Sequence, residues 1–213
     1  QMNGKQEMGT IIFVNNRMCV ECISFCTKMC HNVRKRTGRK EIDNMNKIYD
    51  KVKECYKQVN EMTEFKPQIA LVLGSGLGDY AEKIKIETVI DYHEIKGFPV
   101  STVQGHKGRF VLGYVEDIPV MIMEGRVHYY EGYSMSDVVL PIRLMKMMGA
   151  EILFLTNASG GIHRGFEAGD FMMITDQIAS FVPSPLIGPN IKEFGERFPD
   201  MSHIYDEELQ EVI

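Results

Sequence analysis

The stretch "QIALVLGSGLG", Gln68 to Gly78, decides the fold class of this chain. A continuous apolar run that ends in glycines is typical of a strand covered on both faces. The glycines predict a tight turn whose backbone N–H groups can converge on an anion, with the Ser75 hydroxyl as a further donor. A tight turn without a ligand fits this pattern equally well. The glycine spacing matches neither a dinucleotide fingerprint nor a P-loop, so the stretch predicts no nucleotide cofactor.

Further strands are predicted downstream, at residues 87–92, 109–115, 118–123, 151–156 and 171–174. Between the strands at 118–123 and 151–156 lies a predicted helix. Ser134 with Asp137 three residues later resembles a capping box, and Gly149 supplies a stop. Strand, helix and strand form a βαβ unit, which indicates the α/β class. Before Pro67, apolar residues from Ile48 to Met62 recur at spacings of three and four, which predicts an amphipathic helix.

Length and composition narrow the classes of function. With 213 residues the chain can bury one substantial core, so we expect a single globular domain. No apolar run approaches the ~20 residues that span a bilayer, which argues against a membrane protein. The formal net charge of -5 argues against nucleic acid as a partner, because phosphate backbones are held mainly by Lys and Arg. A small molecule is the expected partner.

The first 43 residues differ in composition from the rest. They carry eight Lys/Arg and four Asp/Glu, whereas the remainder carries sixteen and twenty-five. They also hold four of the five cysteines, in "CVECISFCTKMCH" from Cys19 to His31. A zinc site, a disulfide cluster and a disordered or non-native leader are the alternatives, and the leader is preferred. We therefore expect a leader over 1–43, a domain over 44–213 and, without a signal-peptide core, a cytoplasmic location.

Two later segments contain candidate anion-binding side chains. In "MEGRVHYYEGY", the side chains of Arg126, His128 and Tyr130 point to one side if the segment alternates. A guanidinium, an imidazole and a phenol on one face suit an oxyanion and a hydroxyl group. An Arg126–Glu131 ion pair beside a core tyrosine is the structural alternative. In "TVQGHKGRF", His106 stands between two glycines, where a side chain is usually exposed.

A third segment, "LTNASGG" from Leu155 to Gly161, ends a predicted strand in small residues. Small residues let backbone N–H groups approach a ligand at the carboxyl end of a sheet, which is where open α/β folds bind.

Five motifs, in this order and spacing, carry a resemblance to a known family: "LGSGLG", "GHKGRFVLG", "MEGRVHYYEGY", "TNASGGI" and "FGERFPDMS". Together they resemble the trimeric class of purine nucleoside phosphorylases, from about Met45 to Ile213. The implied fold is a single-domain nucleoside-phosphorylase-like α/β fold, with a central mixed β-sheet flanked by helices. Residues before Met45 have no counterpart in the resemblance.

The family's roles can be carried over to the residues that match its motifs. The resemblance implies phosphate binding by Ser75, His106, Arg126, His128 and the backbone at Ala158, with His128 also as the catalytic residue. It implies a ribose contact by Tyr130. Phe198, in "GERFP", matches the aromatic residue that family members lend to a neighbouring subunit's nucleoside site, which implies a homotrimer.

The implied reaction is reversible phosphorolysis of purine nucleosides, such as inosine and guanosine, to free base and ribose 1-phosphate in purine salvage. Phosphate is a co-substrate, and neither a metal nor another cofactor is implied. The alternatives are a methylthioadenosine phosphorylase and an inactive truncated paralogue that binds only phosphate or partner subunits. The family's purine-recognising residues belong to a later segment, so we expect a C-terminally truncated chain and assign no base specificity.

Overall fold

The computed structural model describes residues 7–14, 38–102, 107–178 and 182–213, with side chains from Lys47 onward. Its centre is a seven-stranded sheet in the order β3-β4-β5-β2-β6-β1-β7. The strands are β1 (Glu7–Val14), β2 (Ile69–Leu73), β3 (Lys85–Asp91), β4 (Arg109–Val115), β5 (Ile118–Glu124), β6 (Ile152–Gly160) and β7 (Phe171–Met173). The helices are α1 (Gly38–Met62), α2 (Met135–Val138), α3 (Leu140–Met148) and α4 (Glu207–Val212). Each strand predicted from the sequence is present.

Strand β2 lies in the middle of the sheet, as its apolar sequence predicts. It pairs in parallel with β5 on one side and with β6 on the other. Strands β4 and β3 continue the sheet in antiparallel pairing beyond β5. The sheet is therefore mixed, and the prediction of an α/β fold is confirmed.

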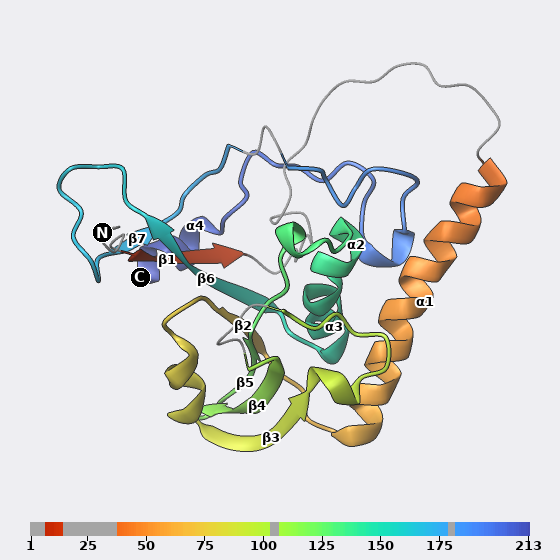
Figure 1. The fold of residues 1–213 in the computed structure, drawn as a ribbon, viewed down its shortest axis with the longest axis horizontal. Coiled ribbons are helices and arrows are strands. Elements are labelled where there is room, and N and C mark those ends of the chain that lie inside the picture. Colours follow the sequence, from red (N-terminus) through yellow and green to blue (C-terminus); the bar gives the residue numbers. More distant parts are fainter. Residues whose placement is uncertain (1–6, 15–37, 103–106, 179–181) are drawn as a thin grey trace.

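The two faces of the sheet are covered differently. Helices α1 and α3 lie side by side at one face (Figure 1), where they pack on a core that includes Val72, Met121 and Met123. Along β5 the neighbouring residues Val120 and Ile122 belong to a smaller cluster on the other face. This alternation follows from the two-residue period of a strand. The short helix η2 (Gly78–Glu82) contributes buried Ala81 to the second cluster.

The predicted helix between β5 and β6 is divided into two. Its start is as predicted, because the Ser134 side chain accepts a hydrogen bond from the Asp137 N–H. Its end is also as predicted, with Gly149 in the left-handed conformation at φ 119°. However, α2 stops at Val138 and α3 begins at Leu140, with Pro141 in its first turn. Proline has no N–H to donate to the preceding turn, so the helix restarts there.

The amino-terminal region contains structure that the sequence did not predict. Strand β1 pairs antiparallel with β6 over its whole length and in parallel with β7. Helix α1 begins at Gly38, ahead of the predicted start. The expected boundary at residue 43 therefore falls inside a helix, and residues 7–14 form a strand. The strand arises because β6 offers an unpaired edge, which a nearby extended segment can complete. The zinc and disulfide alternatives for residues 19–31 lie outside the described residues.

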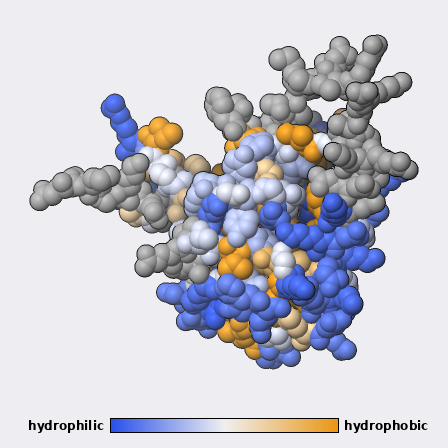
Figure 2. Space-filling view, turned by 45° about the vertical axis from the view of Figure 1, so that its right-hand side comes forward, coloured by the Kyte–Doolittle hydropathy of each residue, from blue (hydrophilic) through white to orange (hydrophobic). Residues whose placement is uncertain are grey.

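The surface is mainly polar on the side seen in Figure 2, where hydrophobic residues form separate patches between hydrophilic ones. In the part of the chain that the structure describes, no helix is both long enough and apolar enough to cross a bilayer. The longest, α1, carries charged residues along most of its length.

Candidate functional site

The candidate residues lie together at the carboxyl ends of three parallel strands, β2, β5 and β6. Strand β2 ends at Leu73 and β5 at Glu124, and these two residues are paired. The "GSGLG" turn and the "GRVHYYEGY" segment therefore start next to each other. Strand β6 carries "TNASG" at the same end. Ligands of open α/β sheets bind at the carboxyl ends of parallel strands.

Thr156 connects two of these segments. Its hydroxyl accepts a hydrogen bond from the Gly74 N–H at 2.8 Å and donates one to the Val72 carbonyl at 2.9 Å. A Cβ atom added to Gly74 would lie 2.5 Å from the Asn157 Cα, so only glycine allows this approach. Gly76, within the turn, has φ 85°, a conformation that glycine adopts without strain. The turn is thus held directly against β6.

Arg126 extends the connection to the third segment. Its Nη1 donates to the Thr156 carbonyl at 2.9 Å, and its Nε donates to His128 Nε2 at 3.3 Å. Burial lowers the pKa of the guanidinium, and the nearby Tyr130 acts in the opposite direction. Among the described residues no Asp or Glu forms an ion pair with Arg126. A half-buried cation without a carboxylate partner is suited to binding an anion.

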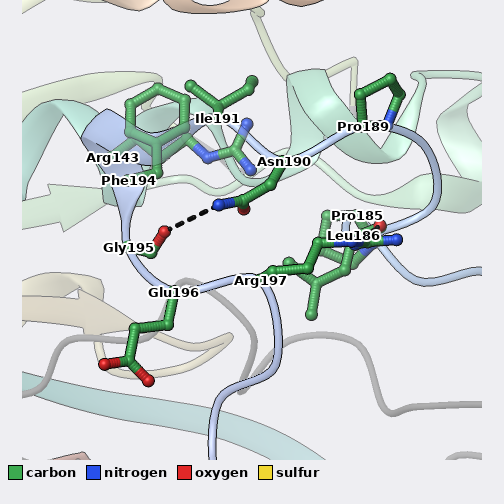
Figure 3. A pocket seen from close by; sticks show the side chains of 10 residues that line it. All are labelled: Arg143, Pro185, Leu186, Pro189, Asn190, Ile191, Phe194, Gly195, Glu196 and Arg197. Atoms are coloured by element: carbon green, nitrogen blue, oxygen red, sulfur yellow. Dashed lines mark hydrogen bonds between the residues drawn. The ribbon is translucent and has the colours of Figure 1, made fainter.

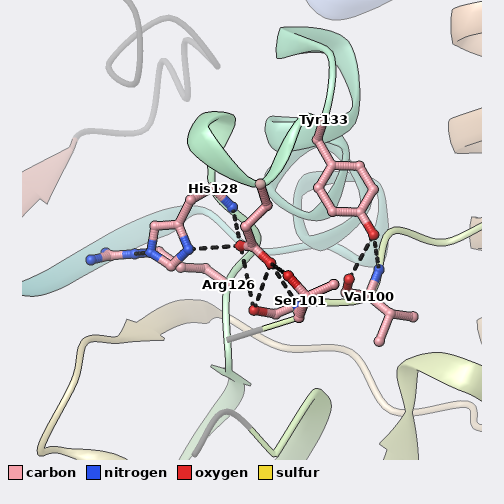
Figure 4. Close-up of polar contacts among 7 residues, drawn as sticks. Val100, Ser101, Arg126, His128 and Tyr133 are labelled. Atoms are coloured by element: carbon pink, nitrogen blue, oxygen red, sulfur yellow. Dashed lines mark hydrogen bonds and ion pairs between the residues drawn. The ribbon is translucent and has the colours of Figure 1, made fainter. Parts of the chain in front are cut away.

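Glu131 holds His128 in place. The two side chains are 2.9 Å apart, from Nδ1 to Oε1, and Oε1 also accepts the His128 N–H at 2.7 Å. Figure 4 shows this contact together with the hydroxyl of Ser101, which donates to the same carboxylate. Thr102 donates through both its N–H and its hydroxyl, at 2.6 and 2.9 Å. The alternative of an Arg126–Glu131 ion pair is wrong, because Glu131 is engaged by these other groups.

These hydrogen bonds have an electrostatic consequence for Glu131. Burial of the carboxyl raises its pKa, but the hydrogen bonds from Thr102 and His128 outweigh this effect and lower the pKa to about 2. Glu131 is therefore ionised at neutral pH and favours a proton on Nδ1 of His128. The ring orientation that follows leaves Nε2 facing Arg126.

Tyr130 completes the cluster on the solvent side. Its ring stacks on His128 with centroids 4.7 Å apart, while 75% of its surface is exposed. Arg126, His128 and Tyr130 line a cavity of about 360 Å³, together with the apolar side chains of Val72, Met123 and Leu155. That volume is within the range of small-molecule sites. The cavity combines apolar walls with a few polar groups on one side.

Two other hollows are less suited to a polar ligand. The hollow shown in Figure 3 has a volume of about 30 Å³, which is too small for a nucleoside. Arg143 lies there over the ring of Phe194, 4.3 Å from its centroid. The third hollow, of about 410 Å³, lies on the other face of the sheet and is almost entirely apolar, with Leu71 and Phe154 among its walls.

Of the other residues predicted to bind a ligand, some lie near Arg126 and others do not. Ser75 is exposed in the turn after Gly74, and Ala158 follows Thr156 by two residues in β6. His106 lies outside the described residues. Phe198 is 83% exposed and contacts the guanidinium of its neighbour Arg197. No hydrogen bond, ion pair or ring contact among the described residues joins Phe198 to Arg126, His128 or Tyr130.

Sequence reasoning missed two residues of the cluster. The sequence does contain a signal for Glu131, because its spacing of three from His128 allows a contact within one turn. Thr156 gave no signal, because its importance depends on a strand that is distant in sequence. Among the residues that the structure describes, no group of three His, Cys, Asp or Glu side chains could hold a metal ion.

The chain is similar to proteins of a known family. The pattern of the phosphorylase superfamily matches residues 68–213. Purine nucleoside phosphorylase 1 of Bacillus subtilis is 47% identical over 163 residues, which cover 76% of this chain and 60% of that protein. Purine nucleoside phosphorylase of Mus musculus is 44% identical over 166 residues, covering 76% and 57%. The chain thus spans about 60% of the length of these two relatives.

Solved structures resemble the fold as well. Purine nucleoside phosphorylase of Schistosoma mansoni in complex with inosine has a TM-score of 0.69 and 37% identity, over 76% of this chain and 58% of that one. Isoform 2 from the same organism, in complex with cytosine and ribose-1-phosphate, has a TM-score of 0.68 and 40% identity, over 77% and 59%.

Proposed function

The chain belongs to the phosphorylase superfamily, and from that premise we propose that it acts on purine nucleosides by phosphorolysis, with Arg126 and His128 binding the phosphate. The observation that carries this proposal is the Arg126 guanidinium, which is half-buried at the carboxyl ends of three parallel strands and has no carboxylate partner among the described residues. An oxyanion supplies the missing negative charge. This chain spans about 60% of the length of the Bacillus subtilis relative. The activity is therefore proposed for the whole enzyme.

The chemistry follows from the arrangement of the cluster. An oxygen of phosphate attacks C1′ of the nucleoside, the bond from C1′ to the purine nitrogen breaks, and the base leaves with that electron pair and takes up a proton. Positive charge develops on the sugar, as in other glycosidic cleavages. A phosphate dianion held beneath the sugar stabilises that charge more strongly in the transition state than in the ground state.

Each residue of the cluster has a role in this proposal. Arg126 donates to phosphate oxygens, and Thr156 orients the guanidinium through its carbonyl. The Glu131 carboxylate holds the His128 ring so that Nε2 faces Arg126, on the side of the proposed phosphate site. Ser75 and the N–H groups of the glycine turn and of Ala158 add uncharged donors. Tyr130, stacked on His128, faces the ribose.

Among phosphorylases, a purine nucleoside phosphorylase is favoured over a methylthioadenosine phosphorylase. The similar proteins named above are all purine nucleoside phosphorylases, and one solved structure contains inosine. The proposal includes a homotrimer in the cytoplasm, with exposed Phe198 reaching the nucleoside site of a neighbouring subunit. No cofactor takes part, because phosphate itself is the nucleophile.

Calorimetric titration with inorganic phosphate tests the site directly. We expect the chain to bind phosphate and Arg126→Met to weaken binding by at least about tenfold, since a hydrogen bond to a charged group contributes roughly 1.5 to 3 kcal/mol. Arg164→Met is the matched control, because Arg164 is an exposed arginine in the loop after β6. Equal phosphate affinity in the Arg126 and Arg164 variants would contradict the proposed site.

Turnover is measured separately, from inosine with and without phosphate, by following release of the free base. Phosphate-dependent release that is lost in Arg126→Met and retained in Arg164→Met supports phosphorolysis. Base release that does not depend on phosphate would indicate a hydrolase instead.

A further inference from the structure

Four charged side chains form a second cluster next to the phosphate site, which we call the Glu124 cluster: Glu82, Lys107, Arg109 and Glu124. Lys107 Nζ lies 2.6 Å from Glu82 Oε1 and 3.0 Å from Glu124 Oε1. Arg109 Nε donates to Glu124 Oε2 at 2.7 Å. Two cations and two carboxylates balance one another, so this cluster has no charge left for a phosphate.

Glu124 lies at the junction of three of the four segments that supply the proposed phosphate ligands. It is the last residue of β5, two positions before Arg126. Its carboxylate also lies against the glycine turn, because a Cβ atom added to Gly78 would be 3.3 Å from Oε1. Its carbonyl accepts the Gly108 N–H at 3.0 Å, and its side chain contacts the residues on both sides of that glycine, Lys107 and Arg109.

Burial of Glu124 makes the pairing with Lys107 and Arg109 necessary for stability. The Glu124 side chain is 5% exposed, whereas that of Lys107 is 38% exposed. An ionised carboxylate at such depth is stable only while its cations stay in place, because an unpaired buried charge costs several kcal/mol. The carboxylate therefore restrains the positions of Lys107 and Arg109. His106, the predicted phosphate ligand, is the residue before Lys107 in the sequence.

We propose that Glu124 is a positioning residue, whose buried carboxylate clamps Lys107 and Arg109 at the start of β4 against the glycine turn, and so sets the relative placement of the phosphate-binding segments. It does not touch the phosphate. The consequence for affinity rests on the proposed function, whereas the clamp itself does not. The clamp and its effect on phosphate affinity can therefore be tested, and contradicted, separately.

Hydrogen exchange tests the clamp without any ligand. Glu124→Gln keeps the shape of the side chain and removes its charge. We expect the amides of Gly108 and Tyr92 to exchange at least about tenfold faster, because Gly108 N–H is bonded to Glu124 O and Tyr92 N–H to Gly108 O. The amides in the core of β2 should keep their rates, which shows that the effect is local. Unchanged exchange at Gly108 would overturn the proposal.

Lys107→Gln provides an independent test if the Glu124 variant does not fold, because Lys107 is partly exposed and its loss still breaks the clamp. Glu61→Gln is the matched control, since Glu61 forms an exposed pair with Lys57 on α1, at 4.0 Å. Each clamp variant should accelerate exchange at Gly108, and the control should not.

Phosphate titration then tests the consequence for the site. We expect Glu124→Gln and Lys107→Gln each to weaken phosphate binding by about tenfold, and the double variant to be no weaker than either one, because both break the same clamp. Additive losses would overturn the shared clamp. If the unaltered chain binds no phosphate, the proposed function fails, and the exchange rates alone decide the positioning role.

Discussion

The imidazole Nδ1 of His128 and the Glu131 Oε1 are 2.9 Å apart, and the same carboxylate accepts hydrogen bonds from both the N–H and the hydroxyl of Thr102. One side chain thus joins the "GRVHYYEGY" segment to the segment before the "GHKGRF" motif. The position of the His128 imidazole therefore depends, through Glu131, on Thr102, which lies in the segment before β4.

This relationship predicts an acid-sensitive contribution to stability. The pKa of Glu131 is lowered from 4.5 to about 2 in the folded chain. The unfolded chain therefore binds more protons between these values, so the contribution is complete above about pH 4.5 and is lost as the pH falls toward 2. It amounts to on the order of 3 kcal/mol at most. Urea unfolding from pH 6 to pH 3 should show the gap between the unaltered chain and Glu131→Gln shrinking. A gap that is constant with pH would contradict the low pKa, and Glu61→Gln is the control.

Thr156→Val should destabilise the chain although the two side chains have nearly the same shape. The substitution leaves the buried Gly74 N–H without its acceptor, which costs roughly 1 to 3 kcal/mol. Urea denaturation at neutral pH measures the difference. Thr88→Val is the control, because Thr88 lies on the edge strand β3, where valine is well tolerated. Equal stability of the two variants would show that the turn does not depend on Thr156.

A chain that starts at Met45 should unfold cooperatively with nearly the same midpoint as the full chain. It keeps Val52, Cys55 and Val59, which are buried in the core and belong to the part of α1 whose side chains are described. Removal of β1 leaves the edge of β6 unpaired, so we also expect association that increases with concentration. Thermal melts and sedimentation at two concentrations test both expectations. A midpoint several degrees lower would show that residues 1–43 contribute to the core.

Phe198→Ala should leave stability unchanged within about 0.5 kcal/mol, because most of the ring is exposed. In an assembled enzyme the same substitution should raise the KM for the nucleoside without changing that for phosphate. Steady-state kinetics with each substrate varied in turn separates these two effects. Phe171→Ala is the matched control, since Phe171 is an exposed phenylalanine in β7. A nucleoside KM unaffected by Phe198→Ala would argue against a shared site.

Much of the fold could be predicted from local patterns. The buried strand at "IALVL", the Ser134 cap and the Gly149 stop depend on nearby residues, and all three are confirmed. The break at Val139 was missed although Pro141 was visible, because the apolar pattern continues across it. Strand β1 was missed because its pairing partner, β6, is more than 130 residues away in the sequence.

By itself, the sequence determined the α/β class, the strands from β2 to β7 and the proximity of Arg126, His128 and Tyr130, because each depends on spacings of a few residues. The tertiary structure alone decided that Glu131 pairs with His128, that Thr156 holds Gly74, and that Glu124 lies between Lys107 and Arg109. Most of these contacts join segments that meet only when the sheet forms. At the carboxyl ends of the strands, burial and geometry decide which of several nearby groups a side chain pairs with. The neighbouring residues in the sequence do not show which of these groups will be near.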